Sequence, residues 1–235
     1  MVEVDGWAER ETIVREVILD TETTGLDPEA GHRVVEIGCL ELLNHVPTGR
    51  TFQCYLNPER DMPLAAFEIH GLSTEFLSKH PVFADVCDAF LAFIDNAPLV
   101  IHNASFDLGF VNAELRRVNK PPLPPSRAVD TVDLARRKFP GAQASLDALC
   151  RRFGVDNSSR TKHGALLDAE LLAEVYLELV GGRQPALELA SRENPIVVES
   201  FNDVRRPPRP HAPSGDELAA HAGLLARLKE PIWNS

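Results

Sequence analysis

The chain has 235 residues, of which 44% are hydrophobic, and it carries a formal net charge of −11. These values predict a globular domain with a substantial core and some remainder, and no apolar run approaches the roughly 18 residues that a membrane span requires. Because nucleic-acid binding by charge alone needs a basic protein, contact with nucleic acid would require bound cations, a narrow end-on contact or a partner.

Residues 1–13 form an N-terminal extension to which the sequence assigns no role. Its first eleven residues are acidic and lack the apolar centre of a signal peptide. We therefore expect a cytoplasmic protein that does not associate with membranes.

Alternating and periodic apolar residues predict the elements of one domain over residues 14–181. Strands are expected at 16–20, 34–43, 51–56, 99–102 and 128–130. Helices are expected at 63–70, 73–78, 83–95, 106–118, 131–139, 146–153 and 165–180. Three early strands, followed by two strands that alternate with helices, predict an α/β fold: a mixed five-stranded sheet flanked by helices, with the strand ending at Asp20 in its middle.

The first candidate site residues are in the segment Asp20-Thr21-Glu22-Thr23-Thr24-Gly25, directly after the apolar run Val17-Ile18-Leu19. Successive strand side chains point to opposite faces, so Asp20 and Glu22 project the same way and could hold hard cations. Acid-x-acid pairs are common in so acidic a chain, and most are solvated surface. Other residues must therefore decide between the two interpretations.

Asp107 follows a second apolar strand at the start of a helix. It is either a helix N-terminal acid that complements the helix dipole or a further ligand beside the first strand. Asp168 lies one turn into the last long helix, where a carboxylate is costly unless it is paired or bound to metal, although a half-exposed helix acid is the alternative. His163, at the start of the same helix, could approach a bound water.

The four cysteines are far apart in the sequence, and no two form a C-x-x-C pair. Each lies in an apolar segment: Cys39, Cys54, Cys87 and Cys150. We interpret them as reduced core thiols rather than zinc ligands or disulfides.

Three motifs in order, DTETTG at 20–25, HNASFD at 102–107 and KHGALLD at 162–168, resemble the DEDDh exonucleases over roughly residues 14–180. The resemblance implies a ribonuclease-H-like fold and two Mg²⁺ or Mn²⁺ ions. It further implies that Asp20, Glu22 and Asp168 hold one ion, that Asp20 and Asp107 hold the second, and that His163 accepts a proton from the attacking water. The implied product is a nucleoside 5′-monophosphate released from a 3′ end.

The resemblance also implies substrate contacts. Thr23 and His70 would line the pocket for the terminal nucleotide, although a histidine before Gly71 is equally common as a helix C-terminal residue. Phe106 is either a core residue or a stacking group near the terminal bases. Asn103 is expected to fix the loop that presents Asp107.

Beyond Gly181 the chain becomes rich in proline, and residues 182–213 read as a flexible linker. Within it, residues 184–189 resemble the short peptides that bind the bacterial sliding clamp, and Gln184, Leu187 and Leu189 would make the contacts. A plain linker is an equally good interpretation. A helix within residues 214–235 would carry an apolar stripe suited to a partner's groove. Its contact residues are expected to be Leu218, Leu225, Leu228 and Trp233.

This combination of domain, linker and terminal helix resembles the epsilon-type proofreading subunits of bacterial replicative DNA polymerases. The resemblance implies removal of mispaired nucleotides from DNA 3′ ends and binding of the polymerase catalytic subunit through residues 214–235. Two alternatives remain: an exoribonuclease for tRNA ends or short oligoribonucleotides, and a mainly structural subunit that bridges clamp and polymerase.

Overall fold

The computed structural model describes residues 13–158, 160, 162–181 and 212–227. The first part contains a single five-stranded sheet with the order β3-β2-β1-β4-β5. Its strands are β1 (Arg15–Thr23), β2 (Val34–Leu43), β3 (Val46–Tyr55), β4 (Leu99–Ile101) and β5 (Ala128–Asp130). The predicted mixed sheet with the first strand in its middle is confirmed.

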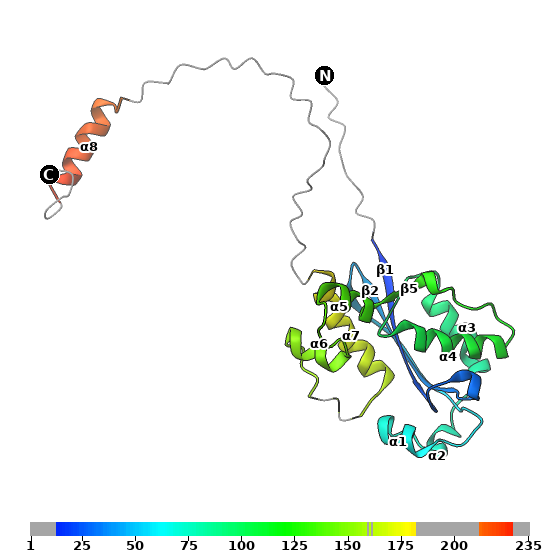
Figure 1. Cartoon of the computed structure of the whole chain (residues 1–235). Coiled ribbons are helices and arrows are strands. Elements are labelled where there is room, and N and C mark those ends of the chain that lie inside the picture. Colours follow the sequence, from blue (N-terminus) through cyan, green and yellow to red (C-terminus); the bar gives the residue numbers. More distant parts are fainter. Residues whose placement is uncertain (1–12, 159, 161, 182–211, 228–235) are drawn as a thin grey trace, which may run out of the picture. The chain divides into compact units, whose positions relative to one another are not determined.

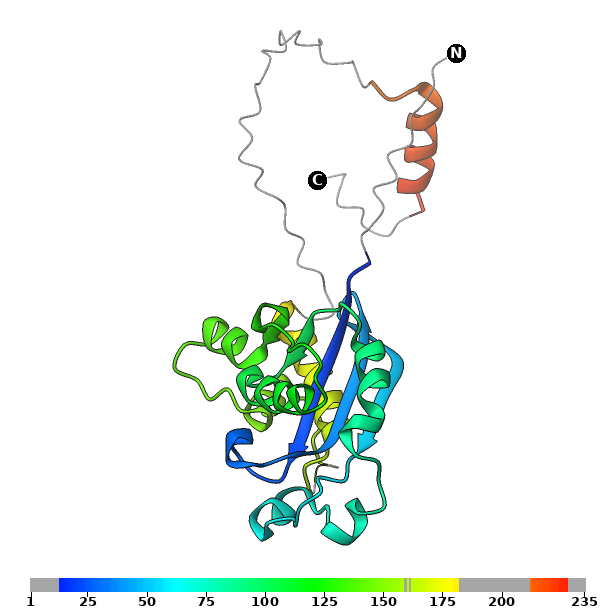
Figure 2. The ribbon, with the colours of Figure 1, turned by 90° about the vertical axis from the view of Figure 1, so that its right-hand side faces the viewer.

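The central strand β1 is hydrogen-bonded on both sides. It runs antiparallel to β2 and parallel to β4, while β3 and β5 form the outer strands. The side chains of Val17, Ile18 and Leu19 are fully buried, since helices cover both faces of the sheet (Figure 1, Figure 2). A continuous apolar run is typical of a strand that is buried on both faces.

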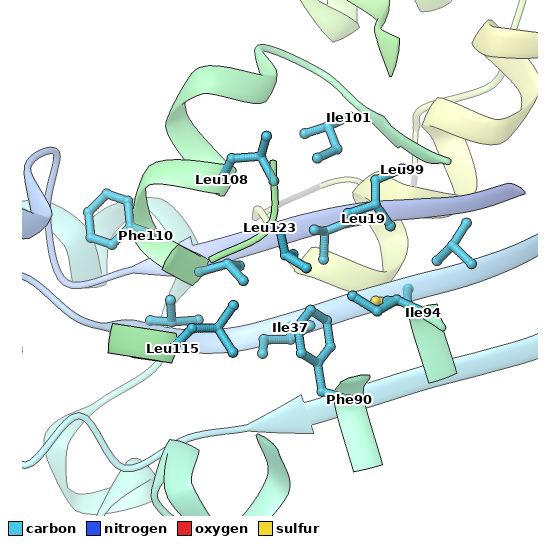
Figure 3. Close-up of a cluster of buried hydrophobic side chains, with 14 of the residues drawn as sticks. Leu19, Ile37, Phe90, Ile94, Leu99, Ile101, Leu108, Phe110, Leu115 and Leu123 are labelled. Atoms are coloured by element: carbon cyan, nitrogen blue, oxygen red, sulfur yellow. The ribbon is translucent and has the colours of Figure 1, made fainter. Parts of the chain in front are cut away.

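Seven helices belong to this part: α1 (Leu64–His70), α2 (Thr74–Leu77), α3 (Phe83–Ile94), α4 (Ala104–Arg117), α5 (Thr131–Lys138), α6 (Leu146–Phe153) and α7 (Ala165–Val180). Short 3-10 helices span Pro28–Ala30 and Pro125–Arg127. On one face, Leu19 and Leu99 pack against Phe90 of α3 and Leu115 of α4 (Figure 3). On the other, Ile18 packs in a cluster with residues of α5, α6 and α7.

Three element boundaries differ from the sequence prediction by more than one residue. β1 continues to Thr23, so Asp20 lies inside the strand, because pairing with β2 extends through Thr21 and Glu22. β3 begins at Val46, five residues earlier than expected, after a two-residue turn in which Asn44 and His45 have φ values of 50° and 66°. Positive φ at both positions matches the twist of a tight hairpin.

The third difference is the start of α4, at Ala104 rather than at residue 106. The carboxylate of Asp130, at the end of β5, accepts hydrogen bonds from the backbone N–H groups of Asn103 and Ala104 at 3.3 and 2.9 Å. These are donors that a helix start leaves without an intrahelical partner. The same carboxylate caps α5 through Val132 N at 2.8 Å.

The cysteines are free thiols. Cys39, Cys87 and Cys150 are buried as expected, whereas Cys54, on the outer strand β3, is only half-buried. Among the described residues, no helix is both long and apolar enough to cross a bilayer.

The second described part contains α8 (Gly215–Leu225), within the segment predicted to hold a terminal helix. Ser214 accepts from the backbone N–H of Glu217, and the Glu217 side chain accepts from Ser214, which together form a capping box. Leu218 is exposed and Leu225 half-buried. The remaining tail residues of the prediction, Gln184, Leu187, Leu189, Leu228 and Trp233, lie outside the described residues.

Candidate active site

Asp20 and Glu22 project from β1 toward the start of α7. Asp20 lies opposite Gly38 and Glu22 opposite Glu36 in the β1–β2 ladder, and opposed residues share one face of a sheet. A Cβ atom on Gly38 would run into the backbone of Ala165, the first residue of α7. The absence of a side chain at residue 38 therefore lets the helix start close to the two acids.

Asp107 reaches the same region from α4, on the other side of the sheet. It is buried in the first turn of the helix, and the hydroxyl of Thr21 donates to its Oδ1 at 2.7 Å. Burial raises the pKa of Asp107 to about 7, although the hydrogen bonds from Thr21 oppose the shift. Asp107 therefore lies both at a helix N-terminus and beside β1.

Asp168 and His163 come from α7 and the segment before it. The Ala165 N–H donates to Oε2 of the buried Glu36 at 3.2 Å, which ties the helix start to β2. Asp168 is buried, whereas the side chain of His163 is 46% exposed, and His163 Nδ1 lies 3.1 Å from Asp168 Oδ2. Burial alone would raise the pKa of Asp168, but hydrogen bonds from His163 and Arg160 and the charge of Arg160 lower it below its usual value.

The acids of β1 repel one another. Burial raises the pKa of Asp20 well above its ordinary value, and the charges of Asp107 and Asp168 raise it further. Burial also raises the pKa of Glu22 to about 8, and the negative charge of Asp168 makes the next largest contribution to this rise. A group of carboxylates with such raised pKa values is suited to binding hard cations, which would offset the repulsion.

Among the described residues, Glu22, His163 and Asp168 can each offer one ligand atom, and these atoms lie within 4.8 Å of one another. Oxygen and imidazole ligands at this spacing fit a divalent ion. Asp20 and Asp107 are outside that group of three, although their charges act on each other and on Glu22. The structure therefore brings all five predicted residues into one region.

A cavity of about 530 Å³ opens beside Glu22 and is lined by Thr23, His70 and Phe106, among others. Nδ1 of the buried His70 accepts from Leu72 N at 3.1 Å, and its Nε2 has no hydrogen-bond partner among the described residues. Asn103 does not line this cavity. It lies on a separate polar cavity of about 720 Å³, and its N–H is bound by Asp130, so its position agrees with a role in holding the loop before Asp107.

A family model described as Exonuclease (RNase_T) matches residues 17–176. A protein named DNA polymerase III subunit epsilon from Rickettsia conorii is 50% identical over 227 residues, which cover 94% of this chain and 99% of that protein. The chain belongs to this exonuclease family. The protein of the same name from Escherichia coli is 47% identical over 179 residues, or 73% of each chain.

Solved exonuclease structures share the fold. The nuclease domain of 3′hExo, a DEDDh family member bound to rAMP, aligns with a TM-score of 0.63 at 19% identity, covering 72% of this chain and 93% of that domain. Exonuclease X in complex with 5′ overhanging duplex DNA aligns with a TM-score of 0.53 at 25% identity, covering 70% of this chain and 90% of that chain. The sheet is thus of the ribonuclease-H-like type, and exonucleases of this DEDDh family depend on divalent metal ions.

Sequence reasoning missed two site residues, Glu36 and Arg160. The sequence could have indicated Glu36 as a site residue, because an acid inside the apolar run Val34-Val35-Glu36-Ile37 is costly unless it is paired. We can identify no such indication for Arg160: it lies in a polar loop, and only the fold brings it to Asp168.

Proposed function

We propose that the chain removes mispaired 3′-terminal nucleotides from DNA by 3′–5′ hydrolysis, as the proofreading subunit of a replicative DNA polymerase. The observation that carries the proposal is the gathering of four acids and His163 around β1 in a chain that matches epsilon subunits over nearly their full length. The alternatives, an exoribonuclease and a mainly structural bridging subunit, differ in substrate and in the need for hydrolysis.

Asp20, Glu22, Asp107 and Asp168 would hold two divalent ions, Mg²⁺ or Mn²⁺. The donor set fits such ions, because carboxylate oxygens are their preferred ligands and ligand oxygens of Glu22 and Asp168 lie within 4.8 Å of each other. Two bound ions would stabilise the attacking and leaving oxygens of a phosphodiester. The chain itself contributes the spacing of the acids, through the alternation of β1 and the first turns of α4 and α7.

His163 would accept the proton of the attacking water. Its side chain is half exposed, so that water can reach it, while Asp168 lies beside Nδ1. An imidazole that donates Nδ1–H to Asp168 keeps a lone pair on Nε2 for the proton. This is the arrangement that a general base requires.

The cavity beside Glu22 would take the terminal nucleoside. Thr23 and His70 lie on its polar side, and Phe106 offers an aromatic face on which a base could stack. Nε2 of His70 is buried without a hydrogen-bond partner among the described residues, so a polar substrate atom would reach it only after the side chain turns toward the cavity.

The tail would supply the partner contacts. Residues 214–235, with α8 and its exposed Leu218, would bind the polymerase catalytic subunit, and residues 184–189 would bind the sliding clamp. An isolated helix of this length is marginal in water, which favours a docked role for α8.

The deciding experiment compares mononucleotide release from 3′-mismatched primer DNA, matched primer DNA and matched RNA, with Asp20→Asn as the blank. We expect the fastest release from the mismatched DNA end, because a frayed terminal nucleotide reaches the cavity at lower cost. Faster release from RNA would favour the exoribonuclease. Release equal to that of Asp20→Asn would leave only the bridging role.

A further inference from the structure

Arg160 contacts both oxygens of the Asp168 carboxylate. Its Nε donates to Oδ1 and its Nη2 donates to Oδ2, each at 2.6 Å. The two side chains are only 9% and 5% exposed. A guanidinium fork of this kind is a planar, charge-assisted contact, and it is stronger than a single hydrogen bond.

The same guanidinium contacts His163. Arg160 Nη2 lies 2.8 Å from His163 Nδ1, which is also the atom 3.1 Å from Asp168 Oδ2. A guanidinium can only donate, so a contact with Arg160 makes Nδ1 the acceptor and places the proton of a neutral imidazole on Nε2. A hydrogen bond to Asp168 instead requires the proton of the neutral imidazole on Nδ1. Arg160 and Asp168 therefore favour opposite tautomers of His163.

Asp147, on α6, gives Arg160 a second acidic partner. Arg160 Nη1 donates to Asp147 Oδ1 at 2.7 Å, and Asn157 Nδ2 donates to the same oxygen at 3.1 Å. The Asp147 side chain is half exposed and lies outside the group of candidate metal ligands. Arg160 can thus leave Asp168 and keep one ion pair.

We propose that Arg160 competes with a divalent metal ion for Asp168, and that its transfer to Asp147 alone frees both Asp168 and His163 for hydrolysis. The inference rests on the proposed function, because it takes Asp168 as a metal ligand. Like charges a few ångströms apart repel by several kcal/mol even at an effective dielectric constant of about 20, so a guanidinium on both oxygens opposes a cation at the same carboxylate.

Once Arg160 has left, Asp168 can accept the Nδ1–H of His163. The Nε2 lone pair is then free to accept a proton. Arg160 is in this sense a positioning residue that acts through Asp168 and His163, and its contact with His163 Nδ1 opposes the tautomer that keeps a lone pair on Nε2.

Calorimetric titration of the full, DNA-free chain with Mn²⁺ tests the competition. Arg160→Gln is expected to bind Mn²⁺ about tenfold more tightly than the wild type, equivalent to about 1.4 kcal/mol. A residue that only supported the shape of the site would weaken binding when replaced. Arg151→Gln is the matched control, since Arg151 is an exposed arginine that lines the same cavity as Arg160, and it should change the affinity far less.

Equal or weaker binding by Arg160→Gln, or a gain no larger than that of Arg151→Gln, overturns the competition. The proposed metal site survives that result if the wild type binds Mn²⁺ and Asp168→Asn does not. If neither the wild type nor Arg160→Gln binds Mn²⁺, both proposals fail. Should Arg160→Gln not fold, as judged by its circular dichroism, Arg160→Met replaces it; this variant removes both the fork and the positive charge, and unchanged or weaker binding would overturn the inference equally.

Discussion

Crowding of carboxylates sets the ionisation of Glu22. Burial and the neighbouring charges raise its pKa from 4.5 to about 8, so the folded protein binds a proton more tightly than the unfolded chain does. A raised pKa of an acid means that its charged form opposes folding. The free energy of unfolding should therefore fall as pH rises through that interval.

Replacing Glu22 with Gln should remove this penalty when metal is chelated. The gain in free energy of unfolding over the wild type should grow by about 1.4 kcal/mol per pH unit between the two pKa values, 4.5 and about 8, and then level off. Urea unfolding in EDTA across this range measures it, and saturating Mn²⁺ should remove most of the wild type's pH dependence. A difference between the two proteins that does not change with pH would contradict the crowding argument.

At the residue scale, the sequence singles out the acids that gather around β1 but not the residues that contact them. Asp20, Glu22, Asp107 and Asp168 stand out because a carboxylate beside apolar residues needs a reason. Arg160 does not stand out, because arginine is ordinary in a polar segment and its contact with Asp168 of α7 depends on the fold. The competition between Arg160 and Asp168 for His163 Nδ1 likewise depends on the fold and not on the local sequence.

Asp130 joins two helices and one strand. Its carboxylate accepts from Ala104 N at the start of α4 and from Val132 N in the first turn of α5. Asp130→Ala should lower the free energy of unfolding by about 1–2 kcal/mol, as loss of a helix cap does, and should slow hydrolysis because α4 carries Asp107. Urea unfolding and primer hydrolysis measure the two effects. The control is Asp133→Ala, an exposed acid in the first turn of α5; equal effects of both variants would contradict the capping role.

The contact between β2 and α7 depends on Gly38. A methyl group there would meet the backbone of Ala165 and Leu166, which cannot move away without shifting the helix that carries Asp168. Gly38→Ala should therefore cost about 1–3 kcal/mol of stability, as overpacking does, and reduce hydrolysis strongly. Thermal melting and a primer assay check this.

Gly109→Ala is the companion variant, because a Cβ at that position in α4 meets no atom within 4 Å. It should be neutral or slightly stabilising, since alanine is the better helix former. If Gly38→Ala behaved in the same way, the close approach of α7 to β2 would not matter for the site.

At the element scale, periodicity predicted the five strands and seven α-helices of the first described part but not its two short 3-10 helices, and the other errors concern element ends. The β2–β3 turn was missed because Asn44-His45 lacks the glycine that usually marks such turns, and Pro47 and Gly49 make the start of β3 look like a loop. The early start of α4 depends on Asp130, 26 residues away in the chain, which no local pattern reveals.

We expect hydrolysis and partner binding to depend on different parts of the chain. A chain ending at residue 181 retains every described residue of the sheet, its helices and the acids around β1. It should melt at the same temperature as the full chain and hydrolyse short mismatched primers at the same rate, but fail to bind the polymerase catalytic subunit. Size-exclusion chromatography with that subunit and a primer assay measure both. Retained polymerase binding would refute the role proposed for residues 214–235.

The position of β1 between β2 and β4 determines when the site loses its geometry during unfolding. Val17 and Ile18 of β1 pair with both β2 and β4, and the apolar residues of the strand face two helical layers. Amides in such a segment exchange with solvent hydrogen mainly through global opening rather than through local fluctuation. Asp20 and Glu22 follow directly after this segment and remain paired with β2, so their spacing should persist until the β1–β2 ladder opens. Any movement of site residues during turnover is then expected near the start of α7, where His163 and Arg160 lie.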